Sequence, residues 1–292
     1  MGAERMSGEQ QINRGVGQGA LVRRLLIGTG VGLTMFFLFA PLLFIFFRAF
    51  ADGAGVYMQN LLDPYTQHAI WLTLLVALIT IPVNLVFGVM LAWLVTRFQF
   101  FGRRVLMTII DIPFAVSPVV AGLVYLLLYG SQGWVGGWLD QYDVQLMFAW
   151  PGLVMVTIFV TCPFVARELI PLMQQQGSSE EEAALTMGAS GWQLFRHITL
   201  PNVRWALLYG VILTNARAMG EFGAVSVVSG SIRGQTNTLA LHVELLAQDY
   251  NTVGAFVSAS LLAGIALITL VVKSIIEWRQ EKRMKLAEES TA

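Results

Sequence analysis

A polar stretch in the middle of an apolar chain carries the residues best suited to a specific protein contact. Three consecutive glutamates, residues 180–182, follow Ser178 and Ser179 at capping-box spacing. A helix that begins here places its negative charges in the first turn, where the helix dipole stabilises them. Gly188 is suited to end that helix, because glycine adopts the left-handed conformation without a Cβ penalty.

A second short helix is expected directly after the first. Ser190 lies three residues before Gln193, again at capping-box spacing, and Pro201 is expected to help end the helix. Trp192 and Phe195 lie three apart and therefore share one helix face. Two interpretations stay open: a solvated hairpin between membrane helices, or a docking surface, since exposed aromatic side chains mark interfaces.

Charged side chains inside apolar runs form the second group with chemical potential. Arg217 and Glu221 lie four apart within the run 205–228, so they share one helix face. A charge at the centre of a bilayer costs about 2.5–3.5 kcal/mol, so such residues normally face protein or water. The two can neutralise each other and lock helix packing, or line a path for an anion. Asp111, two residues before Pro113, is expected to cap or break its own helix.

Small residues after Glu221 allow either close helix packing or a cavity lined by backbone N–H groups and hydroxyls that suits an oxyanion. They are Gly223, Ala224, Ser226, Ser229, Gly230, Ser231 and Gly234.

The composition identifies the elements that must position these residues as membrane helices. The chain has 292 residues, of which 56% are hydrophobic and 12% charged, and its formal net charge is zero. Nothing in that balance favours nucleic acid as a partner. Cys162 is the sole cysteine, the histidines are dispersed without a metal-ligand pattern, and no lysine follows a glycine as in a phosphate-binding loop. Any ATP hydrolysis must therefore take place on another chain.

Six apolar runs are each long enough to cross a bilayer, which takes about 20 residues. They are 25–47, 69–96, 105–129, 147–166, 205–228 and 253–276. The first run is too long for a cleaved signal peptide, and Pro82 is expected to kink the second. The sequence thus predicts an all-α membrane protein with six transmembrane helices.

Successive loops between the apolar runs alternate between many and few arginine and lysine residues. The loops with many are expected in the cytoplasm. On this basis residues 1–22 form a mobile cytoplasmic tail, 23–278 the membrane domain with a cytoplasmic loop at about 167–204, and 279–292 a cytoplasmic C-terminal tail. Outside, 130–146 suggests a turn anchored by tryptophans, and 239–248 a short amphipathic helix that contacts a partner or caps the bundle.

The polar stretch resembles a known motif. Glu182-Ala183-Ala184, then Gly188, then Ile198-x-Leu200-Pro201 resembles the EAA loop of permease subunits in bacterial ABC importers, which have the MetI-like permease fold. The resemblance implies a coupling helix that seats in a groove of an ATPase subunit. With the two aromatic side chains, the expected coupling residues are Glu182, Ala183, Ala184, Gly188, Trp192, Phe195 and Pro201.

A second resemblance narrows the family. Arg217-x-x-Gly220-Glu221-Phe222-Gly223 is similar to the fifth-helix signature of permeases for sulfate, thiosulfate and molybdate. Its extension through Arg233-Gly234, with the segment 111–118, is similar to the CysW-type subunit of sulfate/thiosulfate importers, although Gln235 stands where an acidic residue is typical. The expected translocation path comprises Asp111, Arg217, Glu221, Ser226, Ser229 and Arg233.

These resemblances imply an inner-membrane permease subunit without catalysis or cofactor of its own. Its partners would be a second, similar permease, two ATPase subunits that bind ATP, and an external sulfate/thiosulfate-binding protein. Three alternatives remain: molybdate or tungstate as cargo, an ion-coupled anion transporter that uses Arg217 and Glu221 as a relay, and a channel or scaffold with no energy dependence.

Overall fold

The computed structural model describes residues 20–291, and this part of the chain consists of helices and turns without a β-strand. The all-α prediction is therefore confirmed. The expected mobile tail, 1–22, lies mostly outside the described residues: only 20–22 are described, and they already belong to the first helix.

The first apolar run forms one long helix at the edge of the bundle. Its consecutive parts are α2 (Ala20–Thr34), a π-helical turn η1 (Met35–Phe39) and α3 (Ala40–Ala49). The span Val22–Ala49 is long and apolar enough to cross a membrane, and 0% of its most apolar window is buried within the chain. An exposed apolar helix of this length must be covered by lipid or by another subunit.

The second run forms the longest candidate membrane span among residues 20–291, preceded by α4 (Ala54–Leu62). Helix α5 (Pro64–Arg97) has 34 residues, about 50 Å at 1.5 Å per residue. Asp63 caps its start, because the carboxylate accepts hydrogen bonds from the N–H groups of Tyr65 (3.0 Å) and Thr66 (3.1 Å). The helix continues through Pro82, where the sequence predicts a kink.

The third run is broken into two helices. Helices α6 (Arg103–Ala115) and α7 (Pro118–Tyr129) meet at an angle of 106°. The break lies directly before Pro118, since the residue that precedes a proline is forced out of helical geometry. The expectation that Asp111 caps or breaks its helix was wrong, because Asp111 lies within α6 and the helix passes through Pro113.

The fourth run reaches further than predicted. After α8 (Gly136–Asp140), helices α9 (Trp150–Thr161) and α10 (Pro163–Gln176) form one span, Trp150–Gln176. Because the span ends at Gln176 instead of residue 166, Arg167 belongs to a helix and not to a loop.

The rest of the chain contains the polar stretch, the interrupted fifth run and the last span. Its elements are α11 (Ser179–Thr186), α12 (Gly191–Leu194), the π-helical turn η2 (Phe195–Thr199), α13 (Leu200–Met219), α14 (Gly223–Ser229), α15 (Leu239–Gln248) and α16 (Thr252–Thr291). The short helix predicted at 239–248 is observed as α15, and its external location remains a prediction. Helix α16 does not stop with the membrane run but continues to Thr291.

Within residues 20–291, four helices are long and apolar enough to cross a membrane, and the bent pair α6–α7 makes a fifth if it is counted as one span. The predicted fifth run, 205–228, is divided between α13 and α14 at residues 220–222, and it does not count as an apolar span. Six spans therefore remain a prediction.

Glycines bring the central helices into close contact. A Cβ on Gly88 of α5 would lie 2.6 Å from the Cβ of Val165 on α10, and a Cβ on Gly210 of α13 would lie 3.1 Å from the Cα of the same valine. Because side chains at these two positions would collide with Val165, α5, α10 and α13 cross at backbone distance.

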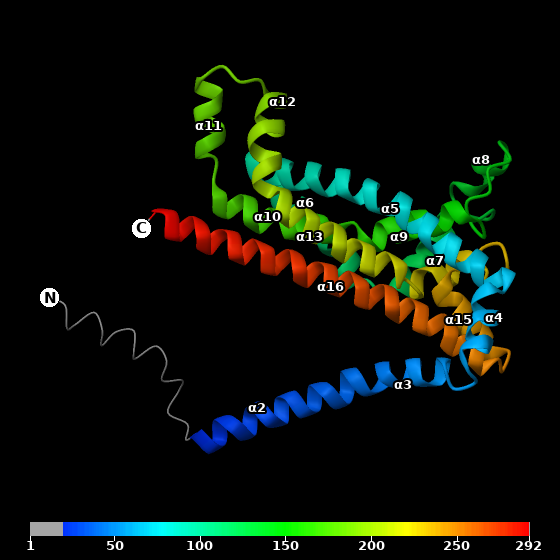
Figure 1. Cartoon of the computed structure of the whole chain (residues 1–292). Helices are drawn as coiled ribbons and strands as arrows, with labels where there is room; N and C mark the ends of the chain where they lie inside the picture. Colours follow the sequence, from blue (N-terminus) through cyan, green and yellow to red (C-terminus); the bar gives the residue numbers. More distant parts are fainter. Residues whose placement is uncertain (1–19, 292) are drawn as a thin grey trace.

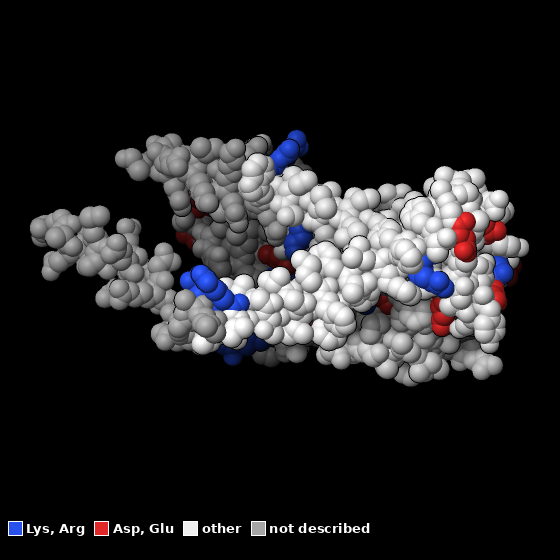
Figure 2. Space-filling view, turned by 60° about the horizontal axis from the view of Figure 1, so that its bottom comes forward, with Lys and Arg blue, Asp and Glu red and all other residues white. Residues whose placement is uncertain are grey.

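The elements gather at two ends of the bundle (Figure 1). Helices α4, α8 and α15 lie at one end, whereas α11, α12 and the C-terminal end of α16 lie at the other. Figure 2 shows charged side chains near both ends, separated by a broad uncharged belt, with acidic residues prominent at the α4–α15 end. This distribution is typical of a bilayer-spanning bundle.

Candidate functional site

The polar stretch 177–201, called the knuckle below, changes direction at two glycines, each of which ends a helix. Gly177 (φ +70°) ends α10, and Gly188 (φ +88°) ends α11. Beyond α11 the N–H of Ala189 bonds to the Ala184 carbonyl (3.0 Å), and the N–H of Gly188 bonds to the Leu185 carbonyl (3.0 Å). These two bonds form the Schellman motif that satisfies the helix end, so the predicted role of Gly188 is confirmed.

The caps of the two knuckle helices were predicted only in part. Ser190 and Gln193 form the expected capping box, with bonds of 2.8 Å and 3.4 Å. The boxes predicted at the start of α11 were wrong: Ser178 makes no cap bond, and its hydroxyl donates to the Glu182 carboxylate at 2.5 Å. Ser178 has ψ near 5° and not the extended backbone that brings an N-cap hydroxyl onto the first turn.

Pro201 does not end the second helix, contrary to expectation. It lies at the start of α13, and the chain remains helical from α12 through η2 into α13. A proline lacks the N–H that would continue the ladder, and its ring collides with the preceding turn. The π-helical turn relieves this collision, since the Leu200 N–H reaches back five residues to the Phe195 carbonyl.

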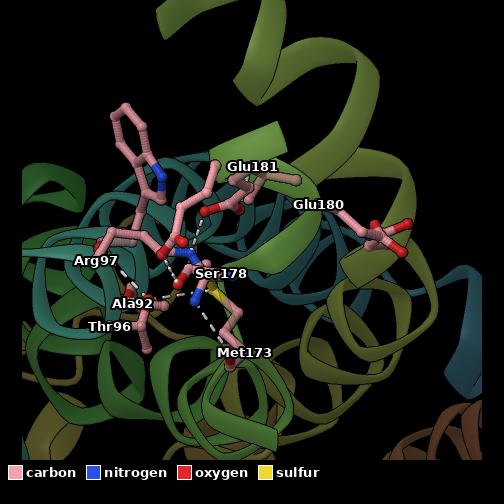
Figure 3. Close-up of polar contacts among 11 residues, drawn as sticks. Ala92, Thr96, Arg97, Met173, Ser178, Glu180 and Glu181 are labelled. Carbon is pink, nitrogen blue, oxygen red and sulfur yellow. Dashed lines mark hydrogen bonds and ion pairs between the residues drawn. The ribbon is translucent and has the colours of Figure 1, made fainter. Parts of the chain in front are cut away.

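The three glutamates of α11 have three different environments, and Figure 3 shows two of them, Glu180 and Glu181. Glu180 lies at the surface and accepts a hydrogen bond from the Asn202 amide at 2.6 Å. Glu181 is buried against Arg97. Glu182, the first residue of the EAA motif, is exposed and bonded only to Ser178 among the described residues. The motif glutamate is thus free to contact another chain.

The outer face of the knuckle is apolar. Three large side chains are exposed there: Leu185 (54%), Met187 (83%) and Trp192 (68%). The Trp192 ring stacks on Phe195 with centroids 5.8 Å apart, and Phe195 contacts Trp93 of α5 at 5.6 Å. The predicted pairing of the two aromatic side chains on one face is therefore observed.

The remaining predicted coupling residues differ in their exposure. Ala183, Gly188 and Pro201 are exposed, whereas Ala184 is buried beneath α11. An apolar cavity of about 250 Å³ adjoins the face; it is lined by Val89, Met90, Trp93, Gly191, Trp192 and Phe195. An exposed apolar face beside a cavity is typical of a protein-docking surface.

The residues predicted for a translocation path form separate groups. Arg217 pairs with Glu221 (Nη1–Oε2 2.5 Å), and the second Glu221 oxygen accepts a bond from the Ala224 N–H at 2.9 Å. Glu221 is 1% exposed and Arg217 33%. The carboxylate therefore holds α13 and α14 together across their break, which supports the packing interpretation of this pair.

Asp111 belongs to a different group. Its carboxylate pairs with Arg167 of α10 at 2.8 Å, and the Arg167 guanidinium lies 4.1 Å from the centroid of the Phe114 ring. Both charged side chains are half exposed. The pair ties α6 to α10 and is separate from Arg217, as the sequence positions suggest.

The two serines and Arg233 are satisfied locally. The Ser226 hydroxyl donates to the Gly223 carbonyl (2.9 Å), and the buried Ser229 accepts from the Ser231 N–H (2.9 Å). Arg233 pairs with Asp249 after α15. Thus the structure does not gather all six expected path residues into one site.

Sequence reasoning missed two interactions. Arg97 and Glu181 make the buried ion pair of the knuckle. His242 of α15, 1% exposed, bonds through Nε2 to the Thr66 hydroxyl (3.1 Å) and through Nδ1 to the Asn237 amide (3.4 Å). Burial lowers the pKa of His242. The Asp63 carboxylate raises this pKa and so opposes the effect of burial, whereas the Arg233 guanidinium lowers it further. No local spacing in the sequence indicates the Arg97–Glu181 or the Thr66–His242 contact, because the two residues of each pair are more than 80 positions apart along the chain.

Comparison with known proteins gives first the class. Residues 84–284 match the family described as "Binding-protein-dependent transport system inner membrane component". A bacterial ABC transporter for the import of the acidic polysaccharide alginate has the same fold, with a TM-score of 0.73 and 17% identity over 90% of this chain and 95% of that one. The predicted ABC permease fold is therefore confirmed.

The relatives then give the particular family. The chain is 64% identical over 264 residues to the sulfate transport system permease protein CysW of Escherichia coli strain K12, covering 90% of this chain and 91% of the relative. It is 50% identical to CysW of Synechocystis sp., over 88% and 94% of the two chains. Permease protein CysT of Escherichia coli is more distant, at 32% over 89% and 94%. The chain belongs to the CysW family of permease subunits.

Proposed function

We propose that this chain is the permease subunit through which an ATP-driven importer moves sulfate and thiosulfate into the cell. The observation that carries the proposal is the knuckle: a glycine-ended helix pair with an exposed apolar face and an exposed motif glutamate, in a chain 64% identical to a sulfate permease. A separate ATPase subunit binds ATP and docks on this face, and the chain itself catalyses nothing.

The arrangement of the ends supports an inner-membrane location with both termini in the cytoplasm. The start of α2, the knuckle and the end of α16 lie at the same end of the bundle (Figure 1). This end carries the arginine-rich loops, which accumulate on the cytoplasmic side. The ATPase therefore reaches the knuckle from the cytosol.

The partners follow from the relatives. CysT is a second sulfate permease related to this chain, so it is the expected companion permease. A related alginate transporter has been solved with a substrate-bound periplasmic protein, so an external binding protein delivers the anion at the α4–α15 end. Two permeases present two knuckles, which suits two ATPase subunits.

In the translocation path Arg217 is the residue suited to meet an oxyanion, because its guanidinium is a third exposed. Glu221 neutralises it, so the cargo is held weakly and released readily. The other expected path residues, Asp111, Ser226, Ser229 and Arg233, would contribute in a conformation that opens their local bonds.

The direct test is uptake of radiolabelled sulfate by cells that lack only this chain, with and without its gene restored. Restored uptake is expected to compete with unlabelled thiosulfate and to fall when ATP is depleted. Competition by molybdate alone would assign the molybdate or tungstate cargo instead. Loss of uptake with ionophores while ATP stays high would favour the ion-coupled alternative.

The role of the knuckle is tested by Glu182→Lys and Gly188→Asp, with Gln248→Lys at the opposite end as the control. Both knuckle variants should lose uptake and retain less ATPase subunit on purification, whereas the control should retain both. Uptake and ATPase association that match the wild type would contradict docking at the knuckle.

A further inference from the structure

One largely buried ion pair joins the knuckle to helix α5. Arg97, the last residue of α5, contacts Glu181 of α11 at 2.5 Å between Nε and Oε2 (Figure 3). The two side chains are only 12% and 9% exposed. Neither belongs to the EAA motif nor to the exposed docking face.

The same pair reaches two further elements. The Arg97 guanidinium donates through Nη1 to the Met173 carbonyl of α10 at 3.2 Å, and the second Glu181 oxygen accepts from the Thr199 hydroxyl of η2 at 2.8 Å. Four elements, α5, α10, α11 and η2, therefore meet at one guanidinium and one carboxylate. A displacement of α11 cannot leave α5 in place without breaking charged contacts that are largely shielded from water.

The other polar ties of α11 are weaker. Glu180 bonds to Asn202 and Glu182 bonds to Ser178, and in both cases the side chains are exposed, so water competes for the same groups. A buried charge that loses its partner stays uncompensated, so the Arg97–Glu181 pair is held closed far more strongly than an exposed contact.

Helix α5 is also fastened at its far end. Near its start the Thr66 hydroxyl bonds to His242 (3.1 Å), and the Thr73 hydroxyl accepts from the Leu239 N–H (2.8 Å). Both partners belong to α15, and all four residues are buried. Helix α5 is therefore about 50 Å long, with an ion pair to the knuckle at one end and hydrogen bonds to α15 near the other.

We propose that the Arg97–Glu181 pair is the mechanical link that transmits motion of the knuckle to α5, and through α5 to α15 at the outer end of the bundle. The inference rests on the proposed docking of an ATPase at the knuckle. Arg97 is a positioning residue: it touches neither cargo nor nucleotide, and it acts by making the knuckle and α5 move together.

The test uses the complete importer, reconstituted with its ATPase, companion permease and sulfate-loaded binding protein. The variant Arg97→Met removes the charge at similar length, and Arg104→Met, which changes an exposed arginine in the first turn of α6, is the control. Arg97→Met should retain the ATPase subunit, because the docking face is untouched, while sulfate transported per ATP hydrolysed falls at least ten-fold. The control should keep the wild-type ratio.

The double variant Arg97→Glu with Glu181→Arg restores the pair with reversed charges and should recover at least half of the wild-type ratio. A wild-type ratio in assembled Arg97→Met complexes would overturn the link. So would a loss of assembly and transport in equal proportion without rescue by the reversed pair, because that pattern marks a folding contact only. If the wild-type chain itself fails to retain the ATPase, the proposed function fails.

Discussion

The left-handed turn at Gly188 gives a prediction whose size follows from the backbone alone. Gly188 has φ +88°, and a Cβ built on it would meet nothing within 4 Å. A substitution therefore introduces no collision, and its cost is the strain of an L-residue in the left-handed region, about 1–2 kcal/mol for alanine. Asparagine tolerates this conformation better, and a β-branched valine tolerates it worse.

A cost of about 1–2 kcal/mol changes the local opening equilibrium about 5- to 30-fold. Gly188→Ala should therefore speed hydrogen exchange of the Ala189 amide, which is bonded to the Ala184 carbonyl, by about that factor. Mass spectrometry of the knuckle peptide in lipid nanodiscs measures it. From slowest to fastest, the exchange of this amide should follow the order wild type, Gly188→Asn, Gly188→Ala and Gly188→Val.

The matched control is Gly191→Ala. Gly191 is also exposed and also has nothing within 4 Å of a built Cβ, but its φ is not positive. This variant should exchange like the wild type. Equal exchange in Gly188→Ala and the wild type, or faster exchange in the asparagine variant than in the valine variant, would refute the assignment of the turn.

Two further predictions concern packing and pH. Gly122→Val should lower the free energy of unfolding by about 1–3 kcal/mol in a detergent melt, because a Cβ at this position would lie 2.6 Å from the Ala224 carbonyl oxygen. Gly264→Val is the control and should leave the melt unchanged, because nothing lies within 4 Å of a Cβ at that position. Equal melting of the two variants would contradict the close contact of α7 and α14. Burial lowers the pKa of His242 below 6.5, so the folded state binds fewer protons than the unfolded one and stability falls as pH drops below 6.5. The melting temperature should thus decrease between about pH 8 and about pH 5.5, and His242→Gln should reduce that decrease; an unchanged pH dependence in the variant would rule out His242 as the source.

Local sequence signals predicted what depends on local backbone chemistry. The Gly188 helix end, the Ser190 capping box and the α15 helix are each set by a few neighbouring residues, and all three are observed. The break in the third run obeys the same kind of rule, since residue 117 precedes Pro118, one of three residues expected to interrupt this run; the other two, Asp111 and Pro113, lie within α6 and do not end it.

What the sequence could not predict depends on three-dimensional placement. Three adjacent glutamates look alike in the sequence, and only the packing of α11 on α5 shows that Glu181, not Glu182, contacts Arg97. Pro201 failed as a helix end because a π-helical turn accommodates it, and no local pattern announces such a turn. The grouping of Asp111 with Arg167 depends on how α6 packs on α10.

The most direct measurement of the central claim uses single cysteines on a Cys162→Ala background. Met187→Cys places a thiol on the exposed knuckle. Trp134→Cys places one two residues before α8, which lies at the opposite end of the bundle (Figure 1), and Trp134 is 92% exposed. A membrane-impermeant maleimide should label the knuckle thiol only in inverted vesicles stripped of ATPase. Added ATPase subunit should protect this thiol from labelling. The thiol at position 134 should be labelled only in intact cells from which the outer membrane has been removed. Knuckle labelling from the outside, or no protection by the ATPase, would contradict the account.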